Sequence, residues 1–217
     1  MPKKKDRVSI PYYSKGEEIV SSISHGIGAG LAVAALVLLV LKAQTPNATV
    51  GVTLYGSIMI ILFTISCIYH ALSPKLTGKK VLRVIDHINV LLMVAGTYIP
   101  ICLSLLYGPL GWTVFGIVWG LTIPAIVFNA INVDKYQVVS TIHNLILGWG
   151  SLFLIGPLRE VCPIAGIWLL IGGGICYTVG SILYGIGSQK KWFHSIFHFF
   201  VIGGAILHFF FIYFYCI

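Results

Sequence analysis

The sequence predicts an all-α membrane protein, a bundle of seven transmembrane helices with a cytoplasmic N-terminus and an extracytoplasmic C-terminus. Of its 217 residues, 58% are hydrophobic and only 9% are charged. A soluble domain carries about 25% charged residues, whereas lipid-facing side chains need no polar groups. The apolar residues also gather in seven long runs. We therefore exclude a water-soluble fold and expect a multi-pass protein of the cell membrane.

Each run is close to the ~20 residues that a membrane-spanning helix needs. The turn signal Gly108-Pro109 separates the third run from the fourth, and Gly156-Pro157 is expected to end the fifth. The first run is too long for the core of a signal peptide. We expect residues 1–16 to form a cytoplasmic N-terminal segment and residues 17–217 the transmembrane domain. The predicted helices cover residues 19–41, 50–72, 82–105, 112–131, 137–154, 164–186 and 193–215.

The positions of the basic residues set the predicted orientation. Twelve of the 14 Lys and Arg residues lie in the N-terminal segment or in the loops after the second, fourth and sixth runs. Only Lys42 and Arg159 lie on the opposite side. Because basic loops stay in the cytoplasm, the N-terminus is expected inside. The net charge of +8 thus reflects membrane topology, and no nucleic-acid partner is expected.

Several classes of membrane protein fit the sequence poorly. A retinal-type receptor would need a lysine in the middle of the last helix, but Lys190 and Lys191 lie at its edge. An ion transporter should have acidic residues along a path, and we expect only Asp86 within a span, with Asp134 and Glu160 in loops. The five cysteines are odd in number and include no CxxC pair, so neither a disulfide framework nor a thiolate metal site is predicted.

Ionisable side chains within the spans gather at one depth. With the predicted orientation, His25, His70, Asp86, His194 and His198 all lie in the inner leaflet, on four different helices. Ionisable groups inside a membrane are rare and usually face the bundle interior. Two further histidines, His143 in the fifth run and His208 deep in the seventh, are read as hydrogen-bonded or interfacial residues.

The spacing of these residues points to chemistry. His194 and His198 are four residues apart, so one helix face presents both imidazoles, a familiar way to supply two zinc ligands. Ser66 precedes His70 by the same interval. Taken singly, each residue has an ordinary structural explanation: Ser66 can bond its own backbone, and Asp86 can pair with Arg83 or Lys80. Those explanations do not predict the shared depth, which favours a common site.

The motifs together resemble the bacterial hemolysin III family, which is related to the progestin and adiponectin receptors (PAQR) and more distantly to the alkaline ceramidases. The resemblance covers the chain from Glu17 to Ile217. One departure is Ser21, where the receptor-type motif usually has Asn. The matching elements, in order, are Glu18-x-x-Ser21-x-x-Ser24-His25, Ser66-x-x-Tyr69-His70, Arg83-x-x-Asp86-His87, Ala95-Gly96-Thr97-Tyr98-x-Pro100 and His194-x-x-x-His198.

The resemblance implies a seven-helix bundle in which His70, His194 and His198 hold Zn²⁺. It also implies that Asp86 holds the zinc-bound water and that Ser66 lies beside the site. Three histidines leave one coordination position open, as in catalytic zinc sites. Asp86 is then expected to act as general base and Ser66 to help hold the developing oxyanion.

The function expected from this site is hydrolysis of a lipid amide or ester in membrane-lipid homeostasis, with membrane lipids as partners. Two other functions stay open. The zinc could be a structural staple in a non-enzymatic membrane sensor or receptor-like protein, or the protein could be cytolytic, as the family name suggests. Glycines of the sixth helix permit close packing, either within one chain or between subunits.

Overall fold

The computed structural model describes residues 8–187 and 190–217, which excludes the first seven residues of the predicted N-terminal segment. Within these ranges the regular structure is entirely helical, and seven segments are long and apolar enough to span a membrane. The prediction of an all-α, seven-span protein is confirmed. The helices are α1 (Lys15–Lys42), α2 (Pro46–Ala71), α3 (Thr77–Pro100), η1 (Ile101–Leu105), α4 (Pro109–Ile131), α5 (Val133–Gly150), η2 (Ser151–Leu154), α6 (Ile155–Val161), α7 (Ile164–Gly187) and α8 (Phe193–Tyr215).

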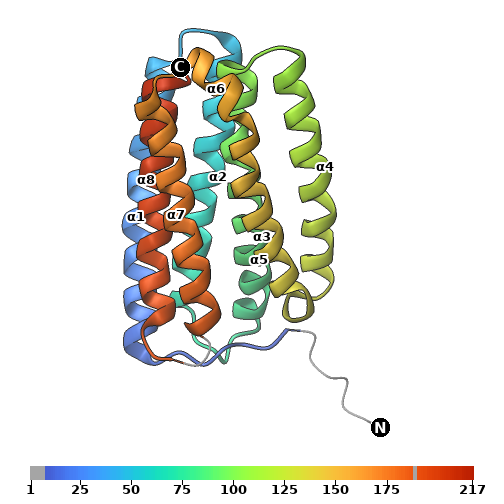
Figure 1. Cartoon of the computed structure of the whole chain (residues 1–217). Coiled ribbons are helices and arrows are strands. Elements are labelled where there is room, and N and C mark those ends of the chain that lie inside the picture. Colours follow the sequence, from blue (N-terminus) through green and yellow to red (C-terminus); the bar gives the residue numbers. More distant parts are fainter. Residues whose placement is uncertain (1–7, 188–189) are drawn as a thin grey trace.

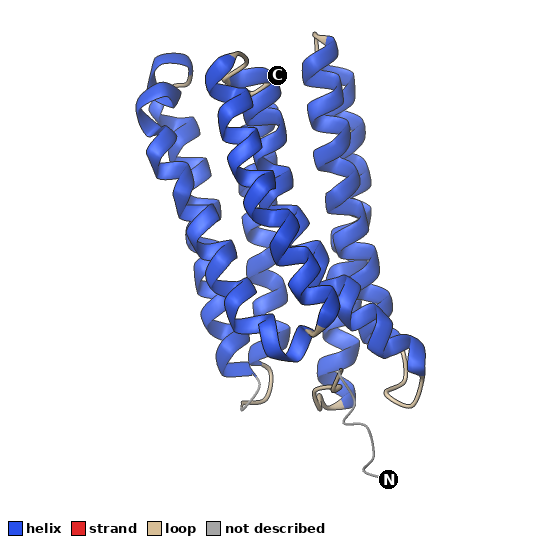
Figure 2. Ribbon diagram, turned by 90° about the vertical axis from the view of Figure 1, so that its right-hand side faces the viewer, coloured by secondary structure: helices blue, strands red, loops and turns tan. Residues whose placement is uncertain are grey.

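The spans run alternately up and down with short connections, so α1 begins at one end of the bundle and α8 finishes at the other (Figure 1). We call the end where α1 begins the N-terminal end. The same end holds the last turn of α2 and the first turns of α3 and α8. Residues far apart in the sequence therefore meet there. Turned by 90°, the bundle shows the same long, nearly parallel helices (Figure 2).

Helix caps explain why three helices begin four residues before their predicted starts. Ser14 caps α1 in a reciprocal capping box with Glu17, which satisfies backbone donors that a helix start leaves unpaired. Thr45 caps α2, with Pro46 at the first helical position. Asn132 accepts from the Lys135 backbone at the start of α5. The hydropathy pattern detects the apolar runs but not these polar first turns.

The predicted end of the fifth helix is wrong. Gly156 and Pro157 do not terminate it, because the chain continues from α5 through the 3₁₀ turn η2 into α6, which reaches Val161. Pro157 lies in the first turn of α6. A backbone N–H at this position has no partner within the helix, so the missing N–H of proline costs no hydrogen bond. In the third span, the helix changes to the π-helical η1 directly after Pro100.

The outer surface of the bundle is apolar, and the polar groups lie inside. Large side chains such as Ile23, Leu31, Ile146, Phe153 and Trp168 are exposed, as lipid contact requires. Within the bundle, glycines let helices approach closely. A Cβ on Gly173 of α7 would lie 2.2 Å from the ring of His208 on α8, and one on Gly204 would lie 2.7 Å from the ring of Tyr177.

Candidate metal centre

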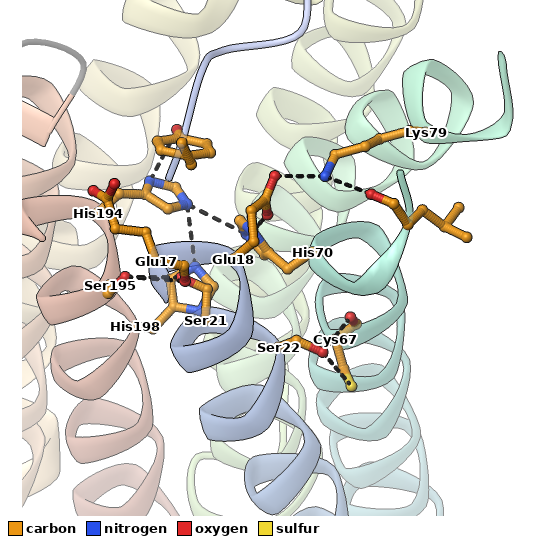
Figure 3. Close-up of polar contacts among 12 residues, drawn as sticks. Glu17, Glu18, Ser21, Ser22, Cys67, His70, Lys79, His194, Ser195 and His198 are labelled. Atoms are coloured by element: carbon orange, nitrogen blue, oxygen red, sulfur yellow. Dashed lines mark hydrogen bonds and ion pairs between the residues drawn. The ribbon is translucent and has the colours of Figure 1, made fainter. Parts of the chain in front are cut away.

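Three histidine rings converge at the N-terminal end of the bundle. His70 lies in the last turn of α2, and His194 and His198 lie in the first two turns of α8. The Nε2 atom of His194 is 3.3 Å from Nε2 of His70 and 3.2 Å from Nε2 of His198. All three side chains are buried, and their ligand atoms lie within 4.8 Å of one another. Figure 3 shows the rings facing one another across the two helices.

This geometry fits a metal ion. A tetrahedral ion with nitrogen ligands 2.0–2.1 Å away holds those nitrogens roughly 3.3 Å apart, which matches the two distances from His194 to the other histidines. Neutral imidazole nitrogens suit zinc and other transition metals rather than magnesium or calcium. The structure thus brings together the three residues that the sequence resemblance assigned as ligands, and the set could hold a metal ion.

Glu18 of α1 links two of the neighbouring helices. Its Oε2 accepts a hydrogen bond from His70 Nδ1 at 2.7 Å, and its Oε1 accepts one from Lys79 Nζ at 2.6 Å (Figure 3). Lys79 is fully buried and also donates to the Leu72 carbonyl. A carboxylate on Nδ1 fixes the ring orientation and leaves Nε2 free for a metal, an arrangement that typically supports metal-ligating histidines.

Tyr13 makes the corresponding contact with His194. The Tyr13 hydroxyl is 3.2 Å from His194 Nδ1, and the two rings are stacked with centroids 4.4 Å apart. Burial raises the pKa of the Tyr13 phenol far above its usual range, so the group remains a neutral hydrogen-bonding partner. Tyr13 precedes α1 and therefore brings the N-terminal segment directly onto the histidine cluster.

The same segment is tied to the bundle by an ion pair. Arg83 of α3 pairs with Asp134 of α5 and donates to the Ser9 carbonyl at 2.9 Å. The Ser9 amide donates to Asp134 Oδ2 at 2.7 Å. Asp134 was expected in a loop, but it lies in the first turn of α5, because the Asn132 cap begins that helix earlier than predicted. The N-terminal segment thus crosses the bundle end beside the cluster.

Asp86 and Ser66 lie next to the three histidines. Ser66 is buried one turn before His70, and the partly buried Asp86 carboxylate is close enough to Ser66 to interact with it electrostatically. Asp86 also interacts electrostatically with His70 and Arg83. Among the described residues, however, the convergent ligand group comprises the three histidines without Asp86. Asp86 is therefore a neighbour of this ligand group and not a member of it.

His25 belongs to the same cluster. Its ring stacks on His198 with centroids 3.8 Å apart and meets Phe63 edge-on at 5.1 Å. It is buried, and neither ring nitrogen makes a hydrogen bond of good geometry within the described chain. The sequence predicted that His25 lies at the same depth as His198, and in the structure the two rings are in direct contact. His143 is half-buried on α5 and away from the cluster, whereas His208 is buried further along α8.

A cavity runs along the bundle from this cluster. Its wall includes Asp86 and His194 at the N-terminal end and Leu170 and His208 towards the other, with side chains from α3, α5, α7 and α8 between them. Polar groups such as Asn144 occur along an otherwise apolar lining. One of the three histidines, His194, therefore borders a cavity in the interior of the bundle.

The sequence reasoning missed two residues of the site. Only Asp86 was expected among acidic residues in a span, but Glu18 lies in the first turn of α1 and contacts His70. Acidic residues are common at helix starts because they complement the helix dipole. The position of Glu18 therefore gave no sign of its contact with His70. Tyr13 stands in a segment read only as a polar tail. The signal that could have found Glu18 is the motif that begins there, whose first position had no assigned partner, whereas Tyr13 lies outside every quoted motif.

The comparisons with known proteins agree with this architecture. The family described as Haemolysin-III related matches residues 13–209. The chain belongs to this family. It is 39% identical over 203 residues to Hemolysin-3 of Bacillus cereus, covering 92% of this chain and 91% of that protein. It is also 39% identical over 204 residues to the Hemolysin-3 homolog of Bacillus subtilis, covering 93% and 95%. The human monocyte to macrophage differentiation factor is 24% identical over 164 residues, covering 72% and 66%.

The family match spans every element of the site, since it includes Tyr13 and both histidines of α8. The resemblance to the hemolysin III family drawn from the motifs is therefore confirmed over residues 13–209. As a haemolysin-III-related protein with seven apolar spans, it is a multi-pass membrane protein.

Proposed function

We propose that this protein is a zinc-dependent hydrolase that cleaves an amide or ester bond of a membrane lipid. One observation carries the proposal: the ligand atoms of three buried histidines converge, and one of these histidines, His194, lines an internal cavity together with the Asp86 carboxylate. Three protein ligands leave room for a further one, which distinguishes catalytic zinc sites from closed structural ones. With the orientation that the basic loops predict, the site faces the cytoplasmic leaflet.

The residues divide the chemistry among them. A metal held by His70, His194 and His198 would supply Lewis-acid chemistry, that is, polarisation of a carbonyl and a lower pKa of bound water. Asp86 accepts the proton of the attacking water and returns it to the leaving amine or alcohol as the carbon–nitrogen or carbon–oxygen bond breaks. Ser66 donates a hydrogen bond to the oxyanion that develops on the carbonyl. The apolar parts of the cavity wall hold the hydrocarbon chain of the lipid.

The proposal is tested with purified full-length protein and a panel of lipid amides and esters, measuring fatty acid release by mass spectrometry. Asp86→Asn should keep the bound metal while release falls by about 10²–10⁴-fold, the usual contribution of a general base. Protein with stoichiometric zinc that releases no fatty acid from any lipid of the panel would refute the enzyme. Unchanged release by Asp86→Asn would refute the role of Asp86.

A structural role for the metal is the second candidate, favoured by one feature. The three ligands and their partners Glu18 and Tyr13 join α1, α2, α8 and the N-terminal segment at a single point. A metal there would staple these parts in a membrane sensor. In that case a chelator lowers the thermal stability of the protein, and Asp86→Asn has no functional consequence that depends on turnover.

Cytolysis, suggested by the name of the bacterial relatives, is supported less well. A secreted lytic protein needs a water-soluble form, and the large apolar side chains exposed around this bundle would then face water. Any lysis is better explained by altered membrane lipids than by a dedicated pore.

A further inference from the structure

A second polar site lies in the same cavity, away from the histidine cluster. His208 lines the cavity wall ten residues beyond His198 on α8, which corresponds to about 15 Å along the helix axis. It is 7% exposed, although it stands in a part of the bundle with few other ionisable groups. A buried imidazole at this depth calls for an explanation, because unpaired polar groups are unfavourable inside a membrane protein.

Only one of the two ring nitrogens of His208 has a hydrogen-bond partner among the described residues. Its Nε2 is 3.2 Å from the Leu170 carbonyl oxygen. Since a carbonyl can only accept, Nε2 carries the proton, and Nδ1 of the neutral ring is an acceptor. Nδ1 is buried and has no partner in the part of the chain that the structure describes. The ring cannot swing away freely, because it packs directly against the Cα of Gly173, where a Cβ would lie 2.2 Å from it.

Tyr177 of α7 supplies the complementary group. Its ring meets His208 edge-on with centroids 5.3 Å apart, and it lines the same cavity. The Tyr177 hydroxyl is buried, and it too lacks a hydrogen-bond partner among residues 8–187 and 190–217. Close packing on Gly204 fixes the ring position. One unpaired acceptor and one unpaired donor therefore belong to two residues that line a cavity whose other end is bordered by His194.

We propose that His208 and Tyr177 form a subsite that binds a hydroxyl group carried within the hydrocarbon chain of the lipid. An alcohol can donate to His208 Nδ1 while it accepts from the Tyr177 hydroxyl, and thus satisfies both atoms. An unsubstituted chain satisfies neither. This inference rests on the proposed function for the identity of the ligand, a lipid in the cavity, and it deepens that proposal by naming hydroxylated acyl chains as the preferred class.

The matched probes are ricinoleic acid and oleic acid, which differ only by a mid-chain hydroxyl. Their binding to purified full-length protein is measured by displacement of a fluorescent fatty acid. Wild-type protein should bind ricinoleic acid about tenfold more tightly, the scale expected when a site built to hydrogen-bond a hydroxyl meets an analogue that lacks it. Tyr177→Phe and His208→Leu should each bring the preference close to one.

Thr122→Val is the control for both variants. Thr122 of α4 carries a buried hydroxyl that donates to the Val118 carbonyl, and it is not part of the cavity wall. Its variant should therefore retain the preference. Equal binding of the two acids by the wild type, as expected if ordered water fills the subsite, would overturn the inference. Loss of the preference in Thr122→Val to the same degree would overturn it as well.

The binding assay needs no turnover, so this inference and the proposed function fail separately. Preferential binding of ricinoleic acid without hydrolysis of any lipid would support the subsite and refute the enzyme. Hydrolysis of ricinoleoyl and oleoyl amides with equal kcat/KM, together with equal binding of the two acids, would support the enzyme and refute the subsite.

Discussion

The contact between Glu18 and His70 leads to a quantitative prediction about metal affinity. The Glu18 carboxylate uses one oxygen for His70 Nδ1, at 2.7 Å, and the other for Lys79 Nζ, at 2.6 Å. Glu18→Gln keeps the shape of the side chain but turns one of these acceptors into a donor and removes the charge. Loss of an outer partner of a metal-ligating histidine typically lowers metal affinity 10–100-fold, which corresponds to about 1.4–2.8 kcal/mol. We expect a decrease of that size.

The measurement is competition for zinc between the purified protein and a fluorescent chelator at fixed pH. Lys79→Met is the matched control, because it breaks the same ion pair but leaves the carboxylate on His70. It should destabilise the fold, since Lys79 is fully buried, without a comparable loss of zinc affinity. Zinc affinity within twofold of the wild type in Glu18→Gln would refute the reasoning. An equal loss in Lys79→Met would show that helix packing, rather than the carboxylate on His70, controls the affinity.

Three further predictions concern other parts of the chain. Tyr13→Phe keeps the stacked ring but loses the hydroxyl contact with His194, so zinc affinity in the same competition assay should fall roughly fivefold, the equivalent of about 1 kcal/mol; unchanged affinity would remove Tyr13 from the site. Gly173→Ala should lower the free energy of unfolding by about 1–3 kcal/mol, because the added methyl group overpacks against His208. Gly30→Ala is its control, since a Cβ there meets no described atom within 4 Å. This control variant should melt at or above the wild-type temperature. If the N-terminus lies in the cytoplasm, alkaline phosphatase fused to the C-terminus should be active. A fusion in the loop between α2 and α3 should be inactive. The opposite pattern would reverse the orientation.

Sequence patterns predict the spans well because the membrane itself imposes their length and polarity. The last two spans begin at the predicted residues, and the errors at α1, α2 and α5 come from polar caps that lie outside the apolar runs. Gly156-Pro157 misled the assignment of the fifth span because a proline is as acceptable at the start of a new helix as it is disruptive inside one.

The three histidines could be predicted as a set because the resemblance to the hemolysin III family assigns them as ligands, and their spacing and depth favour a common site. The partners around them could not, because each contact depends on how separate helices pack. Glu18 reaches His70 only because α1 lies against α2, and Tyr13 reaches His194 only because the N-terminal segment crosses the bundle end. The unpaired atoms of His208 and Tyr177 likewise appear only when the neighbours of each side chain are known.

The central claim is that His70, His194 and His198 bind a zinc ion, and metal analysis of the purified protein tests it most directly. The wild type and a His194→Ala/His198→Ala variant are purified in parallel, and their metal content is measured by mass spectrometry. We predict one zinc per wild-type chain and none in the variant. A wild-type protein that binds no transition metal when zinc is supplied, or a folded variant with unchanged zinc content, would contradict the account.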